Sequence, residues 1–228
     1  MIILTGASGG IGKELLSHLI EIDEVLGIYN TKKPISISSS TLSYQRVDLE
    51  ETAQIASFIE HYRNKLSRVT LIHAAAKKID NLAGVYCEAD WDHVMGVNMK
   101  GNFLLTQALL PFMISERWGR IIHISSLGAI QGRPGTIAYS ASKAGIHGMS
   151  RVLAKEYARF NITSNVLLLG YFDVGMFLAL SNDEKQRIID RIPSKELGDI
   201  SNIANAIKFL IESGYVNGAT INIDGGAD

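Results

Sequence analysis

The start of the chain constrains the fold more than any other stretch, because a strand, a glycine-rich turn and a helix follow one another there. Residues 2–5 are apolar and lead at once into Thr5-Gly-Ala-Ser-Gly-Gly-Ile-Gly12. Apolar residues then recur at helical spacing at Ile11, Leu15, Leu16, Leu19 and Ile20. A helix that begins at such a turn presents unpaired N–H groups and a positive dipole end, and glycines let a phosphate approach the backbone.

The spacing of Gly6, Gly10 and Gly12 departs from the common Gly-x-Gly-x-x-Gly fingerprint, so the turn is also compatible with a tight strand-to-helix connection. Its position directly after the first strand favours the other interpretation, a site for the phosphates of a dinucleotide.

The rest of the chain alternates between further strands and helices without a repeat or linker. Strands are predicted at 24–30, 44–49, 69–76, 119–126, 162–169 and 219–224, and helices at 52–66, 90–97, 103–117, 139–160 and 203–211. The serine-rich segment 34–43 predicts a short or missing crossover helix. We expect an α/β fold in one domain, residues 1–228: a Rossmann-like, doubly wound parallel sheet of about seven strands with helices on both faces. Residues 170–192, with Phe172 and Phe177 exposed, resemble a lid.

Composition and charge exclude several classes of function. A net charge of −1 over 228 residues, without a basic run, argues against nucleic acid. No apolar stretch is long enough to span a membrane, and the six histidines show no paired spacing for a metal. The single Cys87 forms no internal disulfide, so we expect a cytoplasmic protein.

Tyr139 and Lys143 are the strongest candidates for chemistry. They are four residues apart, so on a helix both side chains leave from one face. An ammonium about 4 Å from a phenol, at an effective dielectric of about 20, favours the phenolate by about 4 kcal/mol, or about three pKa units. Ser126 ends the apolar run 121–124, where ligands of parallel sheets gather. Taken alone, the Tyr-x-x-x-Lys pair is more often an accidental helical pair.

The segment after the second strand bears on the choice of cofactor. An NAD site would place an acidic residue about 20 residues beyond the glycines, but Asn30 stands there, followed by Lys32 and Lys33. Lysines would attract a 2′-phosphate, although such lysines are usually only solvated. NADP(H) is therefore favoured over NAD(H). Ala74 and Ala75 would let a flat cofactor lie close, or would simply pack tightly.

In order and spacing, these motifs resemble the short-chain dehydrogenase/reductase family over essentially the whole chain. They are residues 5–12, Asp48-Leu49, Asn98, Ser126, Tyr139-x-x-x-Lys143 and Asp224-Gly-Gly226. The stretches 97–111 and 139–145 are most similar to the 3-oxoacyl-carrier-protein reductase branch.

The resemblance implies a role for each motif residue. Tyr139 would be the general acid, Lys143 would lower its pKa and hold the nicotinamide ribose, Ser126 would bind the reacting oxygen, and Asn98 would position a water. Together with Asn30, Lys32, Ala74 and Ala75 from the arguments above, the predicted cofactor-binding residues are Gly6, Ser8, Gly10, Ile11, Gly12, Asp48, Leu49, Tyr139, Lys143 and Gly170, and the resemblance places Asp48 at the adenine. No metal is implied. Members of the family are usually tetramers, built partly from the helices at 98–117 and 139–160, so we expect a homo-oligomer, a tetramer or dimer.

Three positions depart from the family pattern. His73 replaces an asparagine that ties neighbouring strands, Leu169 stands before Gly170 in place of proline, and Val174 replaces a threonine that often holds the nicotinamide carboxamide. The chain is also short near residues 31–43. These departures bear on cofactor affinity and lid closure more than on the chemistry.

Three functions remain open from the sequence. The first is NADPH-dependent reduction of a ketone, with a 3-oxoacyl thioester, free or bound to a carrier protein, as one candidate substrate. The second is NAD-dependent oxidation of a sugar, polyol or other secondary alcohol. The third is a nucleotide-binding partner protein with little turnover, which a complete set of four catalytic residues disfavours. Arg133, Lys185 and Arg187 are candidates for contacting a carrier protein.

Overall fold

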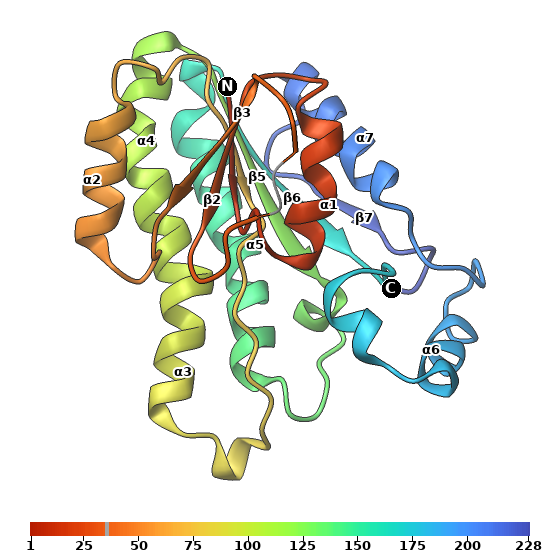
Figure 1. Cartoon of the computed structure of the whole chain (residues 1–228). Coiled ribbons are helices and arrows are strands. Elements are labelled where there is room, and N and C mark those ends of the chain that lie inside the picture. The colour runs from red at the N-terminus through yellow and green to blue at the C-terminus, as the bar shows by residue number, and fades with distance from the viewer. Residues whose placement is uncertain (35–36) are drawn as a thin grey trace.

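The computed structural model describes residues 1–34 and 37–228, and its seven strands form one parallel sheet (Figure 1). The strands are β1 (Ile2–Thr5), β2 (Val25–Tyr29), β3 (Leu42–Arg46), β4 (Thr70–His73), β5 (Gly119–Ser126), β6 (Ile162–Leu169) and β7 (Thr220–Ile223). Their order is β3-β2-β1-β4-β5-β6-β7, so the direction of winding reverses between β1 and β4. In such a sheet the crevice for ligands opens at the carboxyl ends of these strands. The predicted fold class is confirmed.

Helices cover both faces of the sheet because side chains alternate along each strand. Ile2 and Leu4 pack with α1 (Gly10–Leu19) and α7 (Ile200–Glu212). Ile3 faces the opposite layer, formed by α2 (Thr52–Tyr62), α4 (Asn102–Glu116) and α5 (Ile137–Tyr157). β6 and all of β5 except Ser126 are buried on both faces, as expected of central parallel strands.

The remaining helical segments lie around the carboxyl edge of the sheet, except for the turn Ala158–Phe160, which precedes the start of β6. They are α3 (Glu88–Met95), a π-helical segment (Gly96–Gly101), α6 (Asn182–Ile189) and the short 3₁₀ turns Ala83–Val85, Leu127–Ala129, Ala158–Phe160 and Gly175–Ala179. The π-helical segment joins α3 to α4 without a loop, and it contains Asn98, where the sequence predicts a break.

Two boundaries near the site differ from the predictions. β3 ends at Arg46, so Asp48 and Leu49 follow the strand and do not close it. α5 begins at Ile137, which places Tyr139 inside the first turn. Between β2 and β3 no helix is found in the described residues, as predicted for 34–43, although residues 35 and 36 lie outside them.

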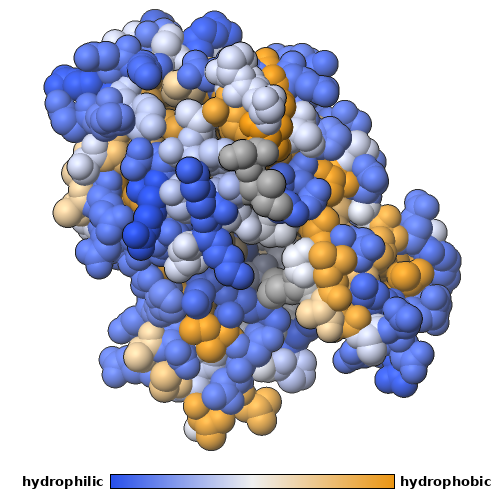
Figure 2. All heavy atoms as spheres, viewed as in Figure 1, coloured by the Kyte–Doolittle hydropathy of each residue, from blue (hydrophilic) through white to orange (hydrophobic). Residues whose placement is uncertain are grey.

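The lid is anchored by its two phenylalanines, which are buried, and the prediction that they are exposed is wrong. Phe172 belongs to the core layer that contains α1 and α7. Between these anchors the lid crosses the carboxyl edge of the sheet, and Leu178, directly after the second anchor, remains exposed. Figure 2 shows apolar surface on this lid and around the 3₁₀ turn Ala83–Val85, where Leu82 and Val85 are exposed.

Candidate active site

The glycine turn after β1 is packed so tightly that Gly6 and Gly12 leave no room for a side chain. Gly6 has φ of +70°, and a Cβ there would lie 2.7 Å from the Cα of Ala75. A Cβ at Gly12 would lie 2.2 Å from the Gly6 carbonyl oxygen. Gly9 precedes α1 and supplies no side-chain cap, so the first N–H groups of the helix remain available to an anion.

Thr5 fixes this turn against the end of β4. Its Oγ1 accepts hydrogen bonds from the backbone N–H groups of Ala74 (3.1 Å) and Ala75 (3.0 Å). The two alanines predicted at the cofactor site therefore lie directly beside the turn. The sequence analysis did not single out Thr5, although a hydroxyl residue ending the first strand beside a glycine turn is a visible signal.

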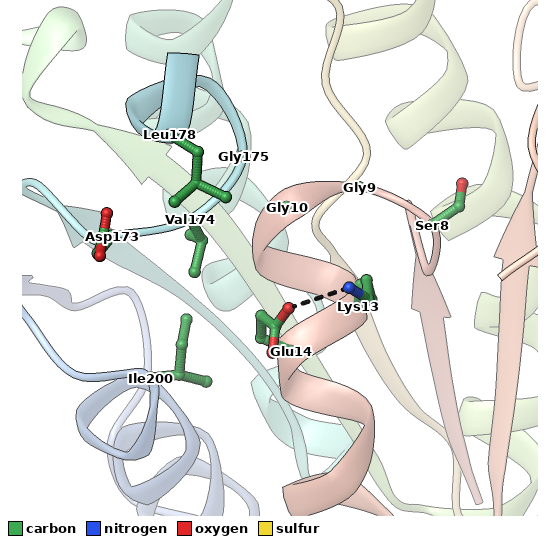
Figure 3. Close-up of a pocket in the computed structure, with 10 residues that line it drawn as sticks. All are labelled: Ser8, Gly9, Gly10, Lys13, Glu14, Asp173, Val174, Gly175, Leu178 and Ile200. Atoms are coloured by element: carbon green, nitrogen blue, oxygen red, sulfur yellow. Dashed lines mark ion pairs between the residues drawn. The ribbon is translucent and has the colours of Figure 1, made fainter. Parts of the chain in front are cut away.

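A cavity of about 460 Å³ opens between the glycine turn and the lid (Figure 3). Ser8, Gly9 and Gly10 form one wall, and Val174 and Gly175 form another. The lid backbone rests on the turn here, because a Cβ at Gly10 would lie 2.4 Å from the Cα of Gly175. An uncapped helix start, backbone free of side chains and an adjoining cavity fit the pyrophosphate of a dinucleotide.

Ser126 and Tyr139 converge at the carboxyl end of β5. A Cβ built on Gly128 would lie 3.6 Å from Ser126 Oγ and 3.6 Å from Tyr139 Cε1, so both side chains border the same small space. Ser126 Oγ accepts a hydrogen bond from the Gly128 N–H (3.2 Å), which fixes its position. A substrate oxygen placed beside Gly128 would meet a serine hydroxyl and a phenol ring together.

Lys143 lies buried behind Tyr139, one helical turn further along α5. Its Nζ is 5.8 Å from the centroid of the Tyr139 ring and donates a hydrogen bond to the Ile124 carbonyl (2.7 Å). Burial lowers the pKa of Lys143 to about 8. The ammonium is thus held next to the phenol by the backbone of β5.

The pKa of Tyr139 moves opposite to the sequence prediction. Burial raises it above 10, the Ser126 side chain lowers it, and the charge of Asp80 raises it further. Burial removes water from the phenol and so disfavours the phenolate. Lys143 does not offset this effect, because its ammonium is directed at the Ile124 carbonyl. In the protein alone, Tyr139 is therefore protonated at neutral pH.

Asn98 is buried and connects three segments of the site. Its Oδ1 accepts from the Lys77 N–H (2.7 Å), and its Nδ2 donates to the Lys77 carbonyl and to Ser142 Oγ (both 2.9 Å). Ser142 Oγ in turn donates to the Tyr139 carbonyl (2.7 Å). Asn98 thereby holds the chain after β4 against the first turn of α5. Ser142 was not among the predicted site residues, although it lies between Tyr139 and Lys143.

The residues predicted to contact the adenosine occupy different environments. Asn30 follows β2, and Lys32 beyond it is exposed. Asp48 is half-buried, and its Oδ1 accepts from the Glu50 N–H (3.0 Å). Leu49, by contrast, points into the core, where it packs against Gly101, so only its backbone is available to a cofactor.

Two further predicted residues lie near the lid and the turn. Ile11 is half-buried in the first turn of α1. Gly170 starts the lid, and its N–H donates to the Ile223 carbonyl (2.9 Å). A Cβ at Gly170 would lie 2.7 Å from the Cα of Asp224, so a glycine is needed for the lid to pass the end of β7.

His73 forms a different tie from the asparagine it replaces in the family pattern. Its Nε2 lies 2.8 Å from Thr106 Oγ1, and because that hydroxyl donates to the Asn102 carbonyl, Nε2 is the donor. The ring stacks on His123 of β5, with centroids 5.0 Å apart. Both Nδ1 atoms lack a hydrogen-bond partner among the described residues. Burial lowers the pKa of both imidazoles, that of His123 to about 3.

The described residues contain neither a membrane-spanning helix nor a cluster of metal ligands. None of the helices in residues 1–34 and 37–228 combines the length and apolarity needed to cross a membrane. Over the same ranges, no cluster of three or more His, Cys, Asp or Glu side chains is placed to bind a metal ion.

Comparison with known proteins gives concordant matches over the chain. The family model for short chain dehydrogenases matches residues 1–185. The chain is 35% identical to a 3-oxoacyl-[acyl-carrier-protein] reductase of Thermotoga maritima, over 97% of this chain and 87% of that one. The Escherichia coli reductase of the same name is 32% identical (98% and 95% covered), and nodulation protein G of Azospirillum brasilense is 31% identical (98% and 96%).

A solved structure supports the fold independently. The crystal structure of a candidate gluconate dehydrogenase from Agrobacterium tumefaciens superposes with a TM-score of 0.89, covering 100% of this chain and 95% of that one. At 24% identity this likeness shows the fold alone. From the family model and the reductase relatives, we conclude that the chain belongs to the short-chain dehydrogenase/reductase family and is an NAD(P)-dependent oxidoreductase.

Proposed function

We propose that this enzyme reduces a ketone to a secondary alcohol with NADPH, and that 3-oxoacyl thioesters are within its substrate class. The observation that carries the proposal is the convergence of Ser126 and Tyr139 at Gly128, with the Lys143 ammonium one helical turn behind. The similarity to 3-oxoacyl-[acyl-carrier-protein] reductases supports the choice of substrate class. Exposed apolar side chains on the lid and around the 3₁₀ turn Ala83–Val85 suit a substrate with an apolar chain (Figure 2).

In this proposal Tyr139 is the general acid. Bound NADPH supplies the hydride that reaches the carbonyl carbon. The Tyr139 hydroxyl gives its proton to the carbonyl oxygen, and Ser126 Oγ donates a hydrogen bond to the same oxygen. Because burial keeps the phenol protonated at neutral pH, Tyr139 is in the form that a reduction requires. The phenolate left behind is stabilised by the Lys143 cation and regains a proton from solvent.

Asn98 acts in this scheme as a positioning residue. Both N–H groups of its amide are engaged with Lys77 and Ser142, so it holds the start of α5, and with it Tyr139, against the end of β4. The Asn98 amide could therefore hold an ordered water of a proton relay only through the second lone pair of Oδ1, since the first accepts from the Lys77 N–H.

We assign the cofactor to the crevice at the glycine turn. Gly6, Ser8, Gly10, Ile11 and Gly12 would border the adenosine and pyrophosphate, and Ala74 and Ala75 would lie under the cofactor. Asp48 and the Leu49 backbone would meet the adenine, and Gly170 would border the nicotinamide end. The preference for NADPH is supported by Asn30 and Lys32, because no carboxylate stands at the end of β2 to repel a 2′-phosphate.

Delivery of the substrate by a carrier protein would require accessible cations near the lid. Arg133 donates to the Tyr171 hydroxyl, and Lys185 lies 3.7 Å from Asp173, so both already have partners. Arg187 on α6 forms no ion pair with any described residue. We propose Arg187 as the first of these residues to test, by comparing carrier-bound with free thioester substrates.

A homo-oligomer, a tetramer or dimer, remains our proposal for the assembly. Phe103 on α4 and Val152 on α5 are exposed large apolar residues on the helices that the family resemblance places at subunit interfaces. Light scattering of Phe103→Asp and Val152→Asp variants tests this, since a charge at an apolar interface lowers the oligomeric state.

The decisive test of the reaction is Tyr139→Phe. We expect turnover of an acetoacetyl thioester with NADPH to fall by about 10²- to 10⁴-fold, because general acid catalysis is lost. The dissociation constant for NADPH should stay within about threefold. Tyr157→Phe, at the far end of the same helix, is the matched control and should keep its activity. Equal turnover in the wild type and Tyr139→Phe would contradict the assignment. Oxidation of a polyol with NAD in preference to ketone reduction would support the second function left open by the sequence.

A further inference from the structure

Arg46, the last residue of β3, lies over the end of β2. Its Nε donates a hydrogen bond to the carbonyl of Asn30, at a distance of 2.9 Å. Backbone pairing supports this placement, since Tyr29 is the sheet partner of Arg46 and the Val47 N–H donates to the Tyr29 carbonyl. The guanidinium is therefore positioned at the residue where dinucleotide-binding sheets meet the adenosine ribose.

Arg46 is also on the face of the sheet that carries the glycine turn. Tyr44 precedes it by two residues and so shares its face. A Cβ built on Gly27 would lie 2.8 Å from the Tyr44 ring and 2.9 Å from the Cβ of Ala7, so both side chains lie over Gly27. Arg46 lies beyond Tyr44, toward the carboxyl edge. It thus lies on the same face as the turn that would hold the pyrophosphate, with β2 between them.

The guanidinium retains most of its hydrogen-bonding capacity. Of the five N–H donors of an arginine, the Asn30 carbonyl occupies one, at Nε. Arg46 is exposed and forms no ion pair with any residue in 1–34 or 37–228. Its two terminal nitrogens form a planar fork that matches two oxygens of a phosphate. Lys32 is exposed two residues beyond Asn30 and adds a second cation.

We propose that Arg46 binds the 2′-phosphate of the cofactor and that its hydrogen bond to Asn30 fixes the guanidinium for this purpose. The inference rests on the proposed function, and it assigns the choice of NADPH over NADH chiefly to Arg46. A ribose hydroxyl offers the fork only a neutral acceptor, whereas a phosphate offers charge-assisted, bidentate bonds. The difference in affinity should be about 10- to 100-fold.

The experiment separates phosphate binding from turnover. Calorimetry measures the binding of adenosine 2′,5′-bisphosphate and of 5′-AMP, which differ only in the 2′-phosphate, and of NADPH and NADH. The variants are Arg46→Gln and Arg46→Lys, which keeps the charge but loses the fork. The matched control is Arg63→Gln, which removes an exposed arginine at the C-terminal end of α2, far along the chain from β3. Circular dichroism and melting temperature confirm that each variant is folded.

We expect Arg46→Gln to weaken adenosine 2′,5′-bisphosphate and NADPH by about 10- to 100-fold and to change 5′-AMP and NADH by less than about threefold. Arg46→Lys should fall between the wild type and Arg46→Gln, and Arg63→Gln should match the wild type. A wild type that prefers NADPH, together with an Arg46→Gln variant that keeps this preference, overturns the role of Arg46 and leaves the proposed function intact. A wild type that binds NADH as tightly as NADPH overturns both the cofactor preference and this inference. Loss of all four ligands in Arg46→Gln would show a role in the fold and not in phosphate selection.

Discussion

The stacked pair of buried imidazoles makes the stability of this protein sensitive to acid. His123 has no exposed surface, and burial together with the charges of Lys143 and His147 lowers its pKa from 6.5 to about 3. His73 has a lowered pKa as well, through burial and the charges of His123 and Lys143. A base whose pKa is lower in the folded state destabilises that state as the pH falls, because only the unfolded chain takes up the proton readily.

The size of the effect follows from the pKa of His123. Stability from this group is fully present above pH 6.5 and is lost progressively as the pH falls toward about 3. Each pH unit below 6.5 costs about 1.4 kcal/mol, so the free energy of unfolding should decrease by about 2.5 kcal/mol between about pH 7 and pH 4.5. His73 adds a loss of the same sign.

We would measure this with urea unfolding of the wild type and His123→Asn, followed by tryptophan fluorescence between about pH 7 and 4.5. Protein concentration is held constant because assembly also affects stability. His123→Asn should be less stable at neutral pH, since it leaves a space in the core, but its decrease between the two pH values should be smaller by about 2.5 kcal/mol. His61→Asn, which removes an exposed histidine of α2, should behave as the wild type. Parallel pH dependences for the wild type and His123→Asn would refute the argument.

Three further predictions concern the site. Because burial lowers the pKa of Lys143 to about 8, kcat/KM for reduction should decline above about pH 8 as the cation is lost. Stopped-flow pH profiles test this, and an unchanged kcat/KM up to about pH 10 would contradict it. Gly10→Ala should weaken NADPH binding by about tenfold or more, because its Cβ would meet the Gly175 backbone at 2.4 Å; calorimetry checks this, and wild-type affinity would show that the lid moves freely. Asn98→Ala should lower the free energy of unfolding by about 1–3 kcal/mol, since the buried Ser142 hydroxyl and the backbone groups of Lys77 lose a partner. An unchanged urea midpoint would mean that water replaces the amide.

The local sequence pattern was sufficient to predict those parts of the fold that depend only on neighbouring residues in the chain. The glycine turn and the helical spacing of Tyr139 and Lys143 are local, and the structure has both as predicted. The bounds of β3 depend instead on pairing with β2, in which Val25 is the partner of Leu42, so the strand predicted at 44–49 was placed too late in the chain. Leu49 packs against Gly101, a residue 52 positions away, and periodicity does not reveal such a contact.

Electrostatic properties were the least accessible from sequence. The spacing of Tyr139 and Lys143 predicts an acidic phenol, but the burial that raises its pKa arises from the whole site. The His73–His123 stack follows from the alignment of β4 with β5, in which the two residues are direct partners. Composition likewise suggested exposed phenylalanines in a glycine-containing lid, whereas Phe172 packs into a core that includes α7, which lies later in the chain.

The meeting of Gly10 and Gly175 has a consequence for attempts to change what this enzyme accepts. Lid segments are natural targets for exchange between relatives, yet here one backbone touches another with no side chain between them, and Gly175 has φ of +57°. A graft that brings any larger residue to position 175 would alter the nucleotide crevice at the same time as the substrate pocket. Selectivity can be redesigned independently of cofactor affinity only if both glycines are retained.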